Sequence, residues 1–183
     1  MGPMRLETAA LCLAPWGPED LLALIEGAST FEERAGMRAA DGLRDFFVSA
    51  DVSPAWLARL RAATDADPWE HGFAVIHRDS ASVIGSAGLK GAPDGQGAAE
   101  IAYGIVPAYQ GRGYATEAAM ALGAFAFADQ RVRLLRAHTL PEPNASTRVL
   151  TKCGFQWIGP VVDPEDGLVW RWERPKPDPG SGE

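Results

Sequence analysis

The sequence predicts an α/β (α+β) domain in which a mixed sheet carries helices on its faces. Segments with strand character alternate with segments of helical periodicity, in the order β-α-α-β-β-β-α-β-α-β. A length of 183 residues and a hydrophobic content of 46% suit one globular domain with a buried core. We expect this domain to span residues 1–174 and the Pro- and Gly-rich segment 175–183 to form a disordered tail.

Local signals place the elements along the chain. Pro18 followed by two acids opens the first helix and Gly27 ends it, while Ser53 caps a later helix. Apolar residues recur at helical spacing through 114–128. The expected elements are a strand at 11–13, a helix at 18–25, one or two short helices within 30–67, strands at 72–77, 83–90 and 100–106, a helix at 114–128, a strand at 132–140, a helix at 144–153 and a strand at 169–172.

Composition and charge argue against several classes of protein. The 17 Lys and Arg residues against 24 Asp and Glu give a net charge of −7, which disfavours a nucleic-acid groove or a polybasic membrane surface. No apolar run approaches the roughly 18 residues of a membrane span, and 1–16 lacks the pattern of a signal peptide. The two cysteines cannot form a disulfide framework. We therefore expect a cytoplasmic protein that binds neither nucleic acid nor membrane.

The segment 100–117 carries the strongest chemical signal, because a strand leads into a glycine-rich loop that opens a long helix. Such loops let a ligand approach the backbone, and free N–H groups at a helix N-terminus bind anions. A P-loop would need a Lys that this loop lacks, and a dinucleotide fingerprint would need Gly where Thr116 stands. A strand-to-helix turn without any ligand is the remaining alternative.

Gln110-x-x-Gly113-x-Ala115 resembles the acyl-CoA pyrophosphate signature of the GCN5-related N-acetyltransferases (GNAT). "GYATEAA" after the loop and "PNASTRVLTKCGF" at 143–155 are similar to the branch of ribosomal-protein alanine and serine acetyltransferases, as is Pro15-Trp16 before the first helix. The resemblance covers about residues 5–174 and implies a mostly antiparallel sheet flanked by helices. It also implies acetyl transfer from acetyl-CoA to a primary amine, on a small molecule or a protein N-terminus, by direct attack in a ternary complex.

The resemblance further implies a binding site for acetyl-CoA. The pantetheine arm would lie along strand 100–106 and bond to backbone groups of Ile105 and Val106, one N–H polarising the thioester carbonyl. Asn144 stands where family members contact the coenzyme, although Asn before a helix is also a standard N-cap. The residues implied around the pyrophosphate are Gln110, Gly111, Arg112, Gly113, Tyr114, Ala115 and Thr116.

Glu100 is the candidate base. An acid at the matching place deprotonates the amine in some members of the superfamily, directly or through water. At about 3.3 Å per residue, Glu100 lies some 16 Å from Ile105 along a straight strand, so it needs a water chain or a bulge, for which Gly104 is suited. The alternative is an exposed carboxylate at the end of a strand.

Ser146 is the candidate acid. It lies on the inward face of the helix at 144–153, where its hydroxyl could protonate the departing thiolate, although it could equally be a first-turn serine. Many superfamily members have a tyrosine acid where this chain has Leu150. If Ser146 does not act, Tyr103, Tyr114 or solvent would supply the proton.

The acceptor is harder to predict. Aromatic residues of the segment 46–73 either line its pocket or belong to the core; they are Phe46, Phe47, Trp56, Trp69 and Phe73. The acidic charge hints at a cationic amine, and a homodimer is a possible assembly. The alternative function is a catalytically weak acyl-CoA-binding or interaction domain. The three histidines are too far apart in sequence to indicate a metal site.

Overall fold

The computed structural model describes residues 4–50 and 52–180, and its centre is a nine-stranded sheet. The strands follow the order β1-β2-β4-β5-β6-β7-β9-β8, and β3 pairs with β5 outside this path. Among the described strands, only β3–β5 and β6–β7 pair in parallel. The predicted mixed, mostly antiparallel sheet is confirmed.

The elements have the following bounds. The strands are β1 (Leu6–Glu7), β2 (Leu11–Pro15), β3 (Arg38–Ala39), β4 (Phe73–His77), β5 (Ser82–Leu89), β6 (Ala98–Ile105), β7 (Leu134–Thr139), β8 (Gln156–Asp163) and β9 (Gly167–Pro175). The helices are α1 (Pro18–Glu26), α2 (Ala28–Ala35), α3 (Asp45–Val48), α4 (Pro54–Ala62), α5 (Pro68–His71), α6 (Tyr114–Phe127) and α7 (Ala145–Lys152), with a 3₁₀ turn at Pro107–Tyr109.

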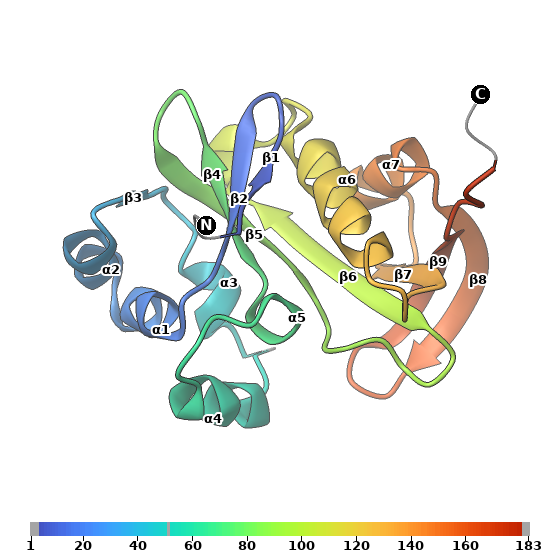
Figure 1. Ribbon diagram of the computed structural model, residues 1–183, viewed down its shortest axis with the longest axis horizontal. Helices are drawn as coiled ribbons and strands as arrows, with labels where there is room; N and C mark the ends of the chain where they lie inside the picture. The colour runs from blue at the N-terminus through green and yellow to red at the C-terminus, as the bar shows by residue number, and fades with distance from the viewer. Residues whose placement is uncertain (1–3, 51, 181–183) are drawn as a thin grey trace.

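Helices cover the sheet on both faces. Figure 1 shows α1–α4 gathered at one end, α6 and α7 beside β6 and β7, and the β8–β9 hairpin at the far end. The face of α6 toward the sheet is built from small residues around Leu122, so the helix lies close to β6. On the opposite face the Phe46 ring of α3 lies over Gly104 of β6.

A half-buried carboxylate ties the start of α6 to the first hairpin. Glu117 accepts hydrogen bonds from the Ala10 N–H, at 2.7 Å, and from the Thr8 hydroxyl. Both donors lie between β1 and β2, at the other end of the sequence. The first turn of α6 therefore has a fixed position relative to the sheet.

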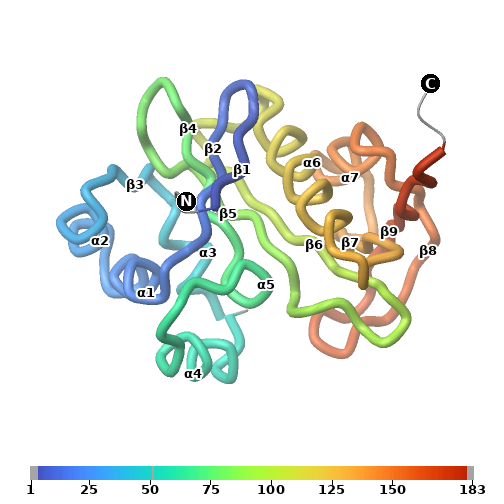
Figure 2. The backbone as a smooth tube through the Cα atoms, viewed as in Figure 1, coloured from blue at the N-terminus to red at the C-terminus, as the bar shows by residue number. Residues whose placement is uncertain are grey.

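The two central strands β6 and β7 pair over three residues and then separate. Their parallel register runs from Ala98↔Leu134 to Glu100↔Arg136. Beyond that point β6 continues to Ile105 against β5 alone, and β7 continues to Thr139 against β9 alone. The separation opens a wedge between the strands, whose paths can be followed in Figure 2.

Several elements differ from the sequence-based expectations. Residues 28–71 hold four short helices rather than one or two, and the strand β8 was not expected at all. β8 contains Gly159 and Pro160, two residues that are unfavourable inside a strand, and its register with β9 shifts between Trp157 and Gly159. Its side chains are exposed or half-buried on both faces, so the strand has no apolar alternation. β9 begins at Gly167 and reaches Pro175, past the end of the domain expected from the sequence.

Candidate active site

The glycine-rich loop between β6 and α6 presents backbone N–H groups to open space. Gly111 and Gly113 have left-handed φ angles of 76° and 83°, and a Cβ at either position would meet no atom within 4 Å. Within residues 4–50 and 52–180, no backbone acceptor takes the N–H groups of Gly111, Arg112 or Gly113. The first intrahelical bond of α6 runs from Glu117 to Gly113, so the N–H groups of 114–116 also lack helical partners. The loop is shaped as a cradle for an anion.

Side chains around the loop fix its shape. Gln110 Nε2 donates to the Ile105 carbonyl at 2.9 Å, and the Arg112 guanidinium lies 5.6 Å from the centre of the Tyr109 ring. The Tyr114 hydroxyl lies 3.0 Å from His77 Nε2 on β4. The side chains of Gln110 and Tyr114 are thus engaged with the protein itself.

The backbone groups of Val106 already make hydrogen bonds within the protein. Its N–H donates to the Ile84 carbonyl at 2.8 Å, and its carbonyl accepts from the Tyr109 N–H at 3.0 Å. The Val106 N–H is therefore engaged within the protein, while its carbonyl oxygen has a second lone pair for a further donor. The Ile105 carbonyl accepts from Gln110, and the Ile105 N–H has no such partner among the side chains of the described residues.

The wedge leaves part of the β6 edge without a strand partner. At one end of this segment the Lys90 N–H donates to the Glu100 carbonyl, and at the other end the Val106 N–H donates to the Ile84 carbonyl. The even-numbered residues of β6 therefore direct their backbone N–H and C=O groups toward β5. Backbone direction alternates along an antiparallel strand, which turns Tyr103 and Ile105 toward the wedge. Their N–H groups form a short free edge that leads directly into the anion cradle.

The start of α7 lines the wedge beside this edge. Asn144 is the N-cap, because its Oδ1 accepts from the Thr147 N–H at 3.0 Å and the Thr147 hydroxyl accepts from the Asn144 N–H at 3.0 Å. Ser146 and Leu150 line the same pocket as Tyr103. Burial raises the pKa of the Tyr103 phenol, with a smaller contribution from Cys153, so the phenol keeps its proton at neutral pH.

The opposite face of β6 and β7 carries a charged network. Glu100 Oε1 lies 2.7 Å from His138 Nδ1 and 3.2 Å from Lys90 Nζ, and Arg171 Nε donates to His138 Nε2 at 3.1 Å. Arginine has no acceptor, so His138 Nε2 must carry the lone pair and Nδ1 the proton, which it donates to Glu100. The hydrogen bonds of the network therefore assign one tautomer to His138.

Lys90 completes this network. Burial lowers its pKa, but Glu100 and the hairpin carboxylates Asp166 and Asp163 more than offset that effect, so its pKa is raised and it stays cationic. The distance from Lys90 Nζ to Asp166 Oδ2 is 3.8 Å. Lys90 thus links the β6 strand to the turn of the β8–β9 hairpin.

Strand β6 has no bulge in its pairing with β5. The β5–β6 register is continuous from Gly85↔Ile105 to Leu89↔Ile101, so the bulge expected at Gly104 is absent from this pairing. The irregularity lies instead between β4 and β5, where the register shifts at Val75 and Ile76. The free edge comes within three residues of Glu100, at Tyr103.

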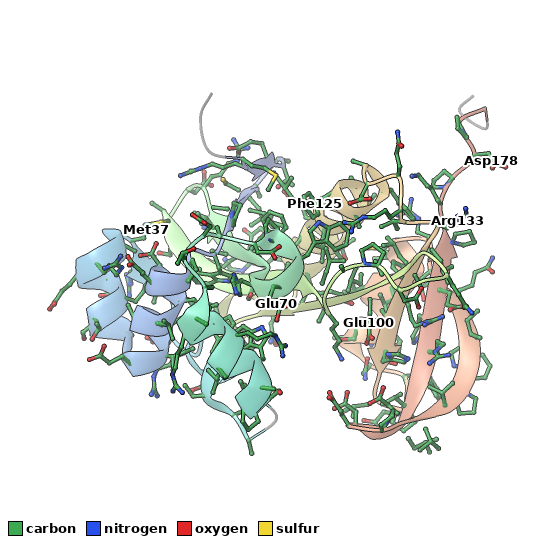
Figure 3. The ribbon with its side chains drawn as sticks, turned by 60° about the horizontal axis from the view of Figure 1, so that its bottom comes forward. Met37, Glu70, Glu100, Phe125, Arg133 and Asp178 are labelled. Atoms are coloured by element: carbon green, nitrogen blue, oxygen red, sulfur yellow. The ribbon has the colours of Figure 1, made fainter. Side chains whose placement is uncertain are left out.

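Two pockets meet at this network. One, of about 480 Å³, runs from Ser146 and Tyr103 in the wedge to Glu100 and His138. The other, of about 490 Å³, lies between α3–α4 and the β8–β9 turn. Both are lined by Lys90, Ala102 and Glu165. Figure 3 shows Glu100 on the sheet between the helical side, marked by Glu70, and the β8–β9 hairpin.

The sequence alone did not indicate several residues of the charged network. It also left open whether the aromatic residues of 46–73 line a pocket or belong to the core. Lys90 directly follows β5, while His138 and Arg171 lie on β7 and β9. The three residues become neighbours only through the sheet order, so no local signal marks them. Phe46, Phe47 and Trp56 line the second pocket. Trp69 and Phe73 instead pack against Phe125 of α6, with ring centres 5.5 and 5.1 Å away.

Within the described residues, no group of three or more His, Cys, Asp or Glu side chains is arranged to hold a metal ion. None of the described helices has the length and apolar character needed to cross a membrane.

Comparison with known proteins matches residues 10–156 to the model of the acetyltransferase (GNAT) domain. The uncharacterized N-acetyltransferase p20 of Bacillus licheniformis is 30% identical over 93 residues, which are 51% of this chain and 52% of that protein. The chain thus spans about half the length of this curated relative.

Solved structures share the fold. The ribosomal-protein-S5-alanine acetyltransferase of Vibrio fischeri superposes with a TM-score of 0.64 at 15% identity, covering 96% of this chain and 98% of that one. The ribosomal α-N-protein acetyltransferase RimL, in complex with coenzyme A, gives a TM-score of 0.63 at 14% identity, covering 94% and 98%.

The His138 tautomer can be measured directly. In protein with isotope-labelled histidine, the ring-nitrogen shifts of His138 at neutral pH should show a protonated Nδ1 and a bare Nε2, because Arg171 donates to Nε2. Arg171→Met removes that donor and should release the other tautomer, whereas Arg148→Met, exposed on α7, should leave the spectrum of His138 unchanged. A protonated Nε2 in the parent protein would refute the network.

Proposed function

The chain belongs to the GNAT acetyltransferase family, and we propose that it transfers an acetyl group from acetyl-CoA to a primary amine in a ternary complex. The observation that carries this proposal is the continuity of the free β6 edge with the N–H cradle of the next loop. An extended ligand with amide groups at one end and a pyrophosphate at the other complements both features. Acetyl-CoA has this construction.

In this proposal the backbone holds the acetyl-CoA. The pantetheine amides pair with Tyr103 and Ile105, and the pyrophosphate lies on the N–H groups of 111–116. A backbone N–H of the free edge faces the thioester carbonyl, and such a donor to a developing oxyanion is commonly worth about 3 kcal/mol. In this proposal Asn144, whose side-chain oxygen caps α7, contacts the coenzyme through its amide nitrogen.

The acceptor amine enters from the other face of β6, where Glu100 lies. An alkyl ammonium has a pKa near 10 and is almost fully protonated at neutral pH, so a proton must leave before the nitrogen can attack. Glu100 accepts that proton, directly or through water. The C–N bond forms as the C–S bond breaks, and the thiolate receives a proton on the α7 side, from Ser146 or through Ser146 from Tyr103.

The alternative function shares the coenzyme site but not the chemistry. A catalytically weak acyl-CoA-binding domain would keep the cradle and the free edge and would transfer no acetyl group. The arrangement of Glu100, His138 and Arg171 favours the enzyme, because a binding domain has no need of a carboxylate and an oriented imidazole beside the wedge. A homodimer and a cytoplasmic location stay predictions.

Gly113→Val tests the cradle. The Val side chain should occupy the open space above the loop and abolish the thermal stabilisation by acetyl-CoA, which amounts to about 2.7 kcal/mol at a ligand concentration a hundredfold above Kd. Gly36→Val is the matched control, because Gly36 also has a left-handed φ, of 67°, with open space around it, and lies outside the site. A folded Gly113→Val protein that is stabilised as strongly as the parent would place the pyrophosphate elsewhere.

Glu100→Gln tests the base. The variant depends on free amine from solution, whose concentration falls about tenfold for each pH unit below the amine pKa near 10. Its kcat/KM should therefore drop by about a hundredfold at neutral pH and fall further as the pH decreases. Glu173→Gln, which breaks the ion pair with Arg136 on the neighbouring strands, is the control. If Glu100→Gln retains the pH–rate profile of the parent, the amine loses its proton to bulk water instead.

A further inference from the structure

We propose that the acceptor is a primary amine joined to an aromatic or bulky apolar body, held in the pocket between α3–α4 and the β8–β9 turn. This inference rests on the proposed function and names its substrate class. We call this space the acceptor pocket; its walls include Phe46, Phe47, Trp56, Lys90, Ala102 and Glu165.

One end of the acceptor pocket is apolar and rigid. The Phe46 ring is 38% exposed and lies against Gly104, where a Cβ would stand 2.9 Å from the ring. Trp56 stacks on Phe47 with ring centres 6.3 Å apart, and its Nε1 donates to the Glu70 carbonyl at 2.9 Å. Because the indole N–H is already satisfied, these rings offer apolar surface and no hydrogen bond to a ligand.

The other end of the acceptor pocket favours a cation. Lys90, Ala102 and Glu165 also line the pocket of Glu100 and His138, so the two spaces are continuous. The carboxylates here, on Glu100, Glu165 and Asp166, outnumber the cations on Lys90 and Arg171. An ammonium at this end would have its charge compensated and would lie beside the proposed base.

The same arrangement disfavours a second cation on the acceptor. Near the aromatic walls the charged groups are Arg59 and Glu70, and these form an ion pair with each other. A second ammonium would lose its hydration against the rings without gaining a free carboxylate. The pocket therefore fits an amphipathic amine better than a diamine or polyamine, despite the acidic net charge of the chain.

A panel of primary amines tests this class on the parent protein with acetyl-CoA. We expect kcat/KM for phenylethylamine to exceed that for ethylamine and putrescine by about tenfold or more, as the burial of one ring predicts. A short peptide with an N-terminal Phe distinguishes a small-molecule amine from a polypeptide N-terminus as the acceptor. Acetylation of the peptide but not of phenylethylamine supports the class and assigns it to polypeptide N-termini.

Variants of the pocket's aromatic residues test whether those rings determine the preference for phenylethylamine. Trp56→Ala and Phe46→Ala should raise KM for phenylethylamine about tenfold, a much larger change than in KM for ethylamine, which has no ring to bind. Trp157→Ala is the control, because Trp157 is 53% exposed on β8 and lies outside the acceptor pocket. Trp56→Leu and Phe46→Leu replace the alanine variants if those do not fold.

The possible failures can be distinguished. Equal rates with all amines, or a preference for putrescine, would overturn the acceptor class alone. An equal loss with ethylamine and phenylethylamine in the Trp56 and Phe46 variants would show a structural role for these rings and would also overturn it. Binding of acetyl-CoA without transfer to any amine would overturn the proposed transferase function and this inference with it.

Discussion

The separation of β6 from β7 after Glu100↔Arg136 is the constraint on which the rest of the site depends. A backbone N–H inside a protein needs an acceptor, and in a sheet the next strand normally provides it. Here β7 continues beside β9, where the Trp172 indole also donates to the Thr139 hydroxyl, and β7 does not pair with Tyr103 or Ile105 in the described structure. The sheet thus contains an internal edge that an extended, amide-bearing ligand can complete.

The groups proposed to act on such a ligand have fixed positions relative to this edge. Gln110 fastens the loop to the last carbonyl of β6, and Glu117 fastens the first turn of α6 to the β1–β2 turn. The anion cradle therefore has a fixed distance from the free N–H groups. On the opposite face, Glu100 belongs to the same strand, so the proposed base and the proposed oxyanion donor share one strand.

The features that depend on local sequence were predictable, and those that depend on sheet order were not. Helical spacing in 114–127 and the glycines at 111 and 113 define α6 and its cradle without help from the rest of the chain. The Glu100–His138–Arg171 contact joins residues 38 and 33 positions apart, and only the order β6-β7-β9 brings them together. Val106 shows the same limit, because its N–H is taken by a strand whose register a sequence does not give.

Amide hydrogen exchange of single residues tests the central claim most directly. In the free protein the N–H groups of Tyr103 and Ile105 should exchange much faster than that of Val106, which donates to Ile84. Saturating acetyl-CoA should slow Tyr103 and Ile105 strongly, together with the loop at 111–116, and leave Val106 as it was. Slow exchange at Tyr103 and Ile105 before the ligand is added, or no change after it, would contradict the account.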